Sequence, residues 1–210
     1  MFKSLFVSLV LTTVSSQAAI FECPKSKQIT IEGVSCCLER LTEDQCRDAI
    51  QSLSQEAKVQ VDACQKQVTS QRPSPKANQE PNAFWSALAY YRESLAKNPQ
   101  NVNDTQFGQI LRRGFAPIHF EAARSGDLLV FQGDFKQKFK DVDTKILQTL
   151  ETSRIVHSGI FISPNFIFQK GDAQSDFSID SIAAVEKGLT PVQKPSASVT
   201  ISVGYYKINP

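Results

Sequence analysis

The chain has 210 residues, of which 41% are hydrophobic, so it can bury one sizeable core and a small appendage. Its formal net charge is +2, and its acidic and basic residues are scattered along the sequence. Because nucleic-acid-binding proteins usually gather basic residues on one face or stripe, this pattern argues against a nucleic-acid partner.

The first part of the chain, residues 1–19, has the pattern of a cleavable signal peptide. Lys3 supplies the positive charge, Leu5–Val14 form an apolar run, and Ser16-Gln17-Ala18 provide the small residues of a cleavage site. The apolar run is too short to span a bilayer, and Cys23 lacks the small preceding residue expected before a lipid-modified cysteine. We therefore expect a secreted or periplasmic protein without stable membrane insertion.

The cysteines are confined to the first third of the chain: Cys23, Cys36, Cys37, Cys46 and Cys64. In an oxidising compartment this odd number favours disulfides with one thiol left over. Zinc binding is the alternative, although the cysteines include no C-x-x-C pair and no histidine lies among them. We expect disulfides, with no metal and no cofactor.

Residues 20–70 are expected to form a small, mostly helical region. A short strand is predicted at Gln28–Glu32, and Thr42 with Gln45 forms a capping-box signature at a helix start. The polar run from Glu43 to about Gln67 predicts one long helix or two short ones with a thin apolar stripe, which disulfides would have to reinforce. Residues 71–81 contain three prolines and no large apolar residue, so they are expected to be a linker.

Residues 82–210 are expected to form the main domain. Asn82 is a good N-cap for a core helix, whose apolar positions recur at helical spacing: Phe84, Leu88, Tyr91 and Leu95. A second helix is predicted at Asp104–Arg112, capped by Asn103 or Asp104.

After Gly114 the pattern changes to strands. Two further helices are expected at Asp134–Thr152 and Ile179–Lys187. Five strands, mostly antiparallel, are expected at Phe115–Phe120, Asp127–Phe131, Ile155–Ile162, Phe166–Gln169 and Val199–Ile208. Helices followed by a mainly antiparallel sheet indicate an α+β fold.

Several motifs of this domain together resemble the NlpC/P60 family of papain-like cysteine peptidases and amidases. The resemblance rests on the Asn82-x-Phe84-Trp85 helix start, the strand Gly126–Phe131, the strand His157–Ile162, and Gln169 twelve positions after His157. It implies helices packed on a five-stranded sheet, with His157 as the catalytic base and Gln169 as the residue that orients it. It covers residues 82–207.

The nucleophile is missing from this pattern, because Ala83 stands where the family has cysteine. Such chemistry needs a thiolate at a helix N-terminus, next to the imidazole that lowers its pKa. Ser86 lies almost one helical turn away, and Cys36 and Cys37 lie outside the matching region, so none of them is a good substitute. Either the natural protein is a pseudoenzyme, or a native cysteine was replaced deliberately.

Two functions follow from these features. The first is a cell-wall peptidase or amidase fold, inactive as written, that binds the peptide stems of peptidoglycan. The second is a non-catalytic binding module of the export compartment, in which His157 is structural; residues 20–70 could also cover the cleft as an inhibitory or targeting segment. Trp85 could line a cleft, although a lone Trp on a core helix usually packs, and His119 is expected to be structural.

Overall fold

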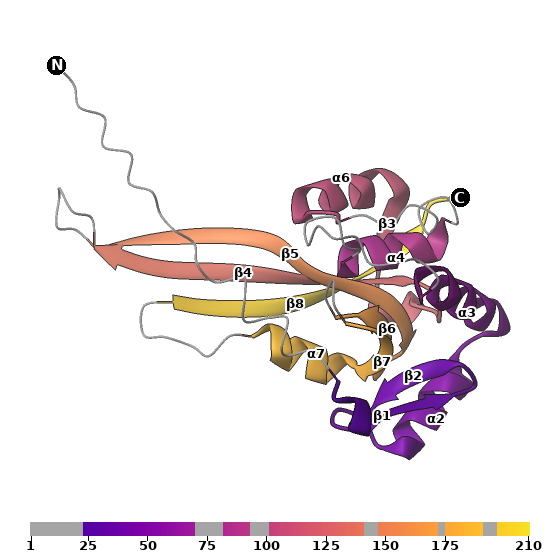
Figure 1. Cartoon of the computed structure of the whole chain (residues 1–210). Coiled ribbons are helices and arrows are strands. Elements are labelled where there is room, and N and C mark those ends of the chain that lie inside the picture. Colours follow the sequence, from indigo (N-terminus) through magenta and orange to yellow (C-terminus); the bar gives the residue numbers. More distant parts are fainter. Residues whose placement is uncertain (1–22, 70–81, 93–100, 141–146, 172–174, 191–196) are drawn as a thin grey trace.

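The computed structural model describes residues 23–69, 82–92, 101–140, 147–171, 175–190 and 197–210 (Figure 1). The expected signal peptide at residues 1–19 and linker at 71–81 lie outside these ranges. The described residues contain both helices and a single large sheet, so the predicted α+β class is confirmed.

The described strands form one mixed sheet with the order β1-β2-β7-β6-β5-β4-β8-β3. Their bounds are β1 (Gln28–Ile31), β2 (Val34–Cys37), β3 (Phe115–Ile118), β4 (Leu128–Lys140), β5 (Leu147–Ser163), β6 (Phe166–Lys170), β7 (Phe177–Ser181) and β8 (Ala197–Ile208). Only β2 and β7 pair in parallel. The expected five-stranded sheet is therefore too small, because the β1–β2 hairpin joins its edge and β7 occupies part of a predicted helix.

The described helices are α2 (Glu43–Ser52), α3 (Gln55–Thr69), α4 (Ala83–Tyr91), α6 (Asp104–Gly114) and α7 (Ile182–Leu189). The starts of α2, α4 and α6 follow local capping, as expected. Thr42 and Asn103 each form a capping box, and the side chain of Asn82 accepts a hydrogen bond from the Trp85 amide (3.1 Å). The N-terminal run is divided into two helices, and it shares its region with a β-hairpin.

The helix expected at Asp134–Thr152 is wrong, because β4 continues to Lys140 and β5 begins at Leu147. The two strands pair continuously from Lys140 opposite Leu147 to the start of β4. The misleading signal was the four-residue spacing of Phe135 and Phe139. Positions four residues apart share one face of a strand as well as one face of a helix, because the period of a strand is two.

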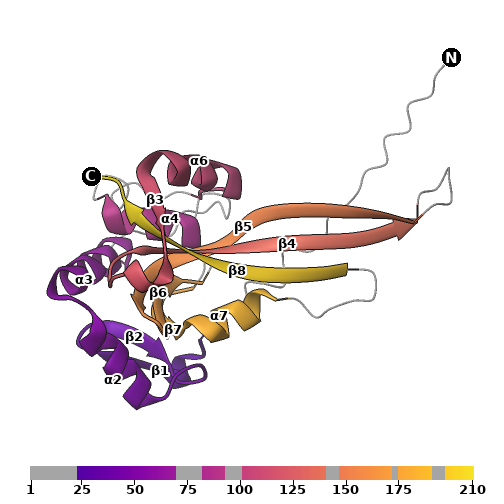
Figure 2. The same ribbon diagram turned by 180° about the vertical axis from the view of Figure 1, so that it is seen from behind.

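The strands β4, β5 and β8 extend beyond the helices as a long arm (Figures 1 and 2). Along this arm β4 is the central strand, paired with β5 on one side and β8 on the other. A bulge interrupts the pairing of β4 with β5 opposite Phe131 and Gln132, where β5 has one extra residue, Val156. The arm therefore joins the body of the sheet through an irregularity in β5.

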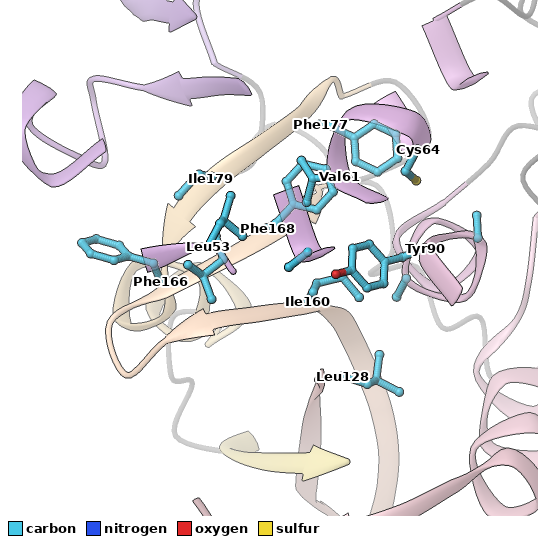
Figure 3. Close-up of a cluster of buried hydrophobic side chains, with 14 of the residues drawn as sticks. Leu53, Val61, Cys64, Tyr90, Leu128, Ile160, Phe166, Phe168, Phe177 and Ile179 are labelled. Atoms are coloured by element: carbon cyan, nitrogen blue, oxygen red, sulfur yellow. The ribbon is translucent and has the colours of Figure 1, made fainter. Parts of the chain in front are cut away.

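Two apolar clusters cover the two faces of the sheet. The larger one includes residues from α2, α3, α4 and α6 together with alternate residues of the strands, such as Leu128 and Ile160. Leu53 and Val61, from the cysteine-containing region, lie in this same cluster (Figure 3). The smaller cluster joins α7 to the opposite face through residues such as Phe131 and Ile167.

The cysteines form two disulfides, Cys23–Cys37 and Cys36–Cys46. Disulfides were the expected outcome, and they use four of the five cysteines that could have bound zinc. Cys64 is the remaining thiol and is buried. The first disulfide links β2 to the segment before β1, and the second links β2 to the first half of α2.

Candidate functional site

The start of α4 is built by its cap and by small side chains. Asn82 ends the preceding segment and caps the helix, so Ala83 is the first helical residue. Ala83 is 7% exposed, and its carbonyl accepts a hydrogen bond from the Ser86 hydroxyl at 2.8 Å. Position 83 thus has the helix N-terminal setting that would lower a thiol pKa, but it carries only a methyl group.

His157 lies at the point where β5 leaves β6. The β5–β6 pairing covers Ile160 to Ser163 of β5, whereas His157 is paired with Phe131 of β4. The imidazole is only 2% exposed and lies 5.7 Å from the Phe131 ring, measured between centroids. A polar ring so deeply buried needs hydrogen-bonding partners.

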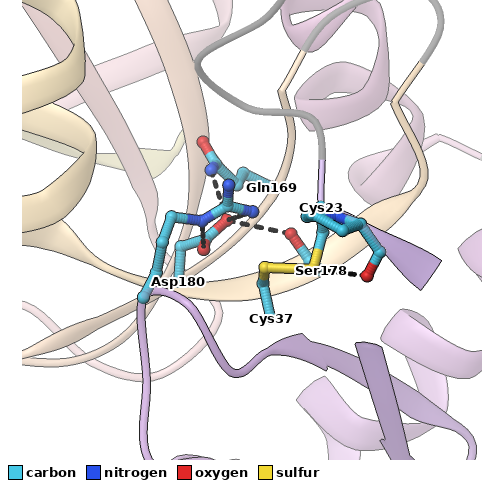
Figure 4. Close-up of a disulfide and its surroundings, with 7 residues drawn as sticks. Cys23, Cys37, Gln169, Ser178 and Asp180 are labelled. Atoms are coloured by element: carbon cyan, nitrogen blue, oxygen red, sulfur yellow. Dashed lines mark hydrogen bonds and ion pairs between the residues drawn. A yellow bond between two sulfur atoms is a disulfide. The ribbon is translucent and has the colours of Figure 1, made fainter. Parts of the chain in front are cut away.

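Gln169 supplies one of these partners, as expected from its position in the sequence. Its Oε1 atom is hydrogen-bonded to His157 Nε2, and its Nε2 atom donates to Asp180 Oδ2 at 2.6 Å. Asp180 also accepts from Ser178 Oγ (2.9 Å) and from Arg40 Nε (2.5 Å). Figure 4 shows Gln169, Ser178 and Asp180 gathered beside the Cys23–Cys37 disulfide.

This network determines which nitrogen of His157 carries the proton. The Asp180 carboxylate accepts four hydrogen bonds from three residues, so it acts only as an acceptor. Gln169 must therefore direct its NH2 group toward Asp180 and its carbonyl oxygen toward His157. His157 Nε2 is then the donor, and in the neutral ring Nδ1 is the basic nitrogen.

The helix start contacts β5 beside the histidine. Ser158 Oγ lies 3.4 Å from the Ala83 carbonyl oxygen, which brings the first turn of α4 against the residue that follows His157. Side chains alternate along a strand, so Ser158 points to the face covered by α4, and His157 points to the face that carries Phe131. The structure thus brings His157 and Gln169 together, and it places the start of α4 against Ser158, on the opposite face of the strand from His157.

The other sequence candidates are buried away from this network or exposed. Trp85 is fully buried in the larger cluster. The Ser86 hydroxyl is already bonded within its own helix. Burial raises the pKa of the Cys64 thiol to about 12, so this cysteine is no substitute nucleophile. His119 lies in an exposed turn before a short 3-10 helix, outside the site.

Asp180 and Arg40 were missed by the reasoning from sequence. Asp180 lies at the start of the helix predicted for Ile179–Lys187, but the segment is β7 up to Ser181, and Ser178 and Asp180 share one face of that strand. The pattern Phe177-Ser178-Ile179-Asp180 alternates between apolar and polar residues and could have indicated the strand. Nothing comparable marked Arg40, which lies 140 residues away from its partner.

Searches of protein-family models, curated proteins and solved structures found no match to this chain. Among the described residues, no cluster of three or more His, Cys, Asp or Glu side chains is arranged to hold a metal ion. None of the helices in the described ranges is long and apolar enough to cross a membrane.

Proposed function

We propose that this chain is an exported relative of the papain-like NlpC/P60 hydrolases that keeps the base and its orienting residue but has lost the nucleophile. It binds peptide stems of peptidoglycan without cleaving them. The observation that supports this proposal best is the bond between His157 Nε2 and Gln169 Oε1, in a strand whose next residue, Ser158, contacts the capped start of α4.

The chemistry of a thiol hydrolase agrees with this arrangement. Such an enzyme needs one imidazole nitrogen turned toward the nucleophile and the other held by a polar group. In this protein Gln169 holds Nε2, and the neutral ring has Nδ1 as its base. An alanine at position 83 prevents acyl-enzyme formation, because it offers no atom to attack a carbonyl.

The ligand class is inferred from the family resemblance and from the expected export of the protein. Peptide stems of peptidoglycan are short, polar and found outside the cytoplasmic membrane. The two disulfides agree with folding in an oxidising compartment.

The test restores the missing thiol with Ala83→Cys. We expect this thiol to react with iodoacetamide below about pH 7, because a helix N-terminus and an adjacent imidazole stabilise the thiolate. Ala116→Cys, on the exposed part of β3, is the matched control and should react only as pH approaches about 8.5. Adding His157→Ala to the Ala83→Cys variant should narrow the difference from the control, leaving only the part that the helix N-terminus supplies.

Incubation with muropeptides completes the test. The Ala83→Cys variant should release a new product that the unmodified chain does not release. If its thiol titrates like that of the Ala116→Cys control and no product forms, the catalytic ancestry of the site is rejected.

The burial of the site favours a second candidate, a binding module in which His157 is structural. Ala83 and His157 are only 7% and 2% exposed, so a ligand would have to bind at the rim of this region. Muropeptide binding that is lost in His157→Ala but unchanged in Ala83→Cys would support ligand recognition without catalytic ancestry. Binding that neither substitution changes would place recognition elsewhere.

A further inference from the structure

We propose that Asp180 and Arg40 are positioning residues for His157, so that the disulfide-stapled N-terminal segment completes the site of the main domain. The inference rests on the proposed function, because positioning matters only if His157 acts on a nucleophile or a ligand. It extends that function by two residues to which the family resemblance gives no role, and by the N-terminal region, which the resemblance does not cover.

Asp180 is the centre of the network. Its side chain is fully buried, and its two oxygens accept hydrogen bonds from Gln169, Ser178 and Arg40. A buried carboxylate is tolerated only when it is paired and hydrogen-bonded. Because the carboxylate can only accept, it fixes the orientation of the Gln169 amide.

Arg40 provides the balancing charge, and its place is set by the N-terminal segment. It lies in the turn after β2, where its amide donates to the Cys37 carbonyl at 3.0 Å. Cys37 is tied to Cys23 by a disulfide. β2 is aligned on β7 by the pairing of Cys36 with Ile179, the residue just before Asp180. The disulfide-linked turn and the pairing of β2 with β7 therefore position Arg40 next to Asp180.

The direction of each hydrogen bond passes along this network. Arg40 can only donate, so it requires an acceptor at Asp180 Oδ1. The carboxylate then accepts from Gln169 Nε2, and Gln169 Oε1 accepts from His157 Nε2. Arg40 and Asp180 thus select one tautomer of the His157 imidazole through Gln169.

Asp180→Asn should reverse the direction of the hydrogen bonds from position 180 to His157, with almost no change in the shape of the side chain. Arg40 still requires an acceptor, so the new amide turns its oxygen toward Arg40 and its NH2 group toward Gln169. Gln169 must then rotate its amide, presenting its oxygen to position 180 and its NH2 group to His157. His157 Nε2 becomes an acceptor, and the proton moves to Nδ1.

The experiment measures the tautomer directly on the full chain. Both histidines are labelled with 15N, and long-range 1H–15N correlation spectra are recorded at about pH 8, where an ordinary imidazole is neutral. His119→Gln assigns the two sets of signals. The expected spectrum of the unmodified chain has His157 protonated at Nε2 by about tenfold over Nδ1, the ratio set by one net hydrogen bond.

In Asp180→Asn we expect the ratio to invert in favour of Nδ1, by a similar factor of about tenfold. Asp176→Asn, an exposed change of the same chemistry nearby, is the control and should leave the ratio unchanged. Adding Arg40→Met to Asp180→Asn should return a mixture, because the amide at position 180 is no longer oriented. Restoring a cation with Arg40→Lys should recover part of the inversion.

An unchanged His157 tautomer in a folded Asp180→Asn variant overturns the inference. If that variant does not fold, Arg40→Met combined with Asp180→Asn decides: a mixture of the two tautomers supports the inference, and an unchanged excess of the Nε2 tautomer rejects it. A tautomer that responds as expected, combined with an inert thiol in Ala83→Cys, rejects the proposed function and leaves the positioning role intact. A reactive thiol in Ala83→Cys, combined with a His157 tautomer that does not respond to Asp180→Asn, supports the proposed function and rejects the positioning role.

Discussion

Arg40→Met should destabilise the protein strongly, although the side chain lies in the small N-terminal region. The substitution keeps much of the apolar stem and removes the guanidinium. Asp180, which is fully buried, then keeps two neutral donors and loses the guanidinium of Arg40, whose own side chain is 14% exposed. Leaving one member of a buried ion pair uncompensated costs about 3–5 kcal/mol.

The partial exposure of Arg40 and the remaining hydrogen bonds place our expectation at the lower end, about 3 kcal/mol. This is a large part of an ordinary domain stability of about 5–15 kcal/mol. It corresponds to a shift of about 1–2 M in the urea midpoint for a slope of about 2 kcal/mol/M. Unfolding can be followed by the fluorescence of the single tryptophan, Trp85, with the disulfides kept oxidised.

The matched control is Arg47→Met. Arg47 pairs with Glu43 one helical turn away, and both side chains are more than half exposed. Exposed pairs of this kind contribute about 0.3–0.5 kcal/mol. In addition, Arg40→Met combined with Asp180→Asn should recover at least about 1 kcal/mol relative to the sum of the two single changes. If Arg40→Met costs no more than Arg47→Met, the buried pair does not stabilise the fold as argued.

Two further predictions concern the core. Burial raises the pKa of the Cys64 thiol from 9.0 to about 12, so this thiol should resist alkylation at about pH 8 until urea unfolds the chain. The folded state favours the protonated thiol. Its contribution to stability is therefore complete below pH 9 and is lost as the pH rises toward 12. Rapid labelling of the native protein would contradict this burial. Gly159→Ala should cost more than about 2 kcal/mol, because the added Cβ would lie 2.6 Å from Ile167 Cδ1 and 2.8 Å from the Phe168 carbonyl oxygen. Gly114→Ala, with nothing within 4 Å of the added Cβ, is its control in the same urea assay, and equal costs for the two would refute the steric argument.

The features that sequence reasoning predicted well are local. The starts of α2, α4 and α6 depend on side chains that bond the backbone three residues later, so Thr42, Asn82 and Asn103 were recognisable from the chain alone. The contact of His157 with Gln169 was expected from the family resemblance, and the short connection between β5 and β6 is what brings the two residues together. In each case the interacting residues lie close in the sequence.

The features it missed depend on distant partners. An even spacing of aromatic residues in the segment after Phe131 fits a helix and a strand equally, and the pairing with β5 and β8 decides between them. The join between the cysteine-containing region and the main sheet depends on β2 meeting β7. The ion pair of Arg40 with Asp180 follows from that join, so it had no signal of its own.

The bulge in β5 has a consequence for how the strand assigns its side chains. Phe131 and Phe135 lie on one face of β4, where Phe131 meets His157 and Phe135 meets the guanidinium of Arg154, 4.7 Å from the ring centroid. An odd-numbered and an even-numbered residue of β5 therefore share that face, since the extra Val156 changes the parity of the strand. If Val156 were deleted, either the arm residues of β5 or His157 would have to move to the opposite face of the sheet. The face that the histidine occupies is thus determined by strand length as much as by residue type.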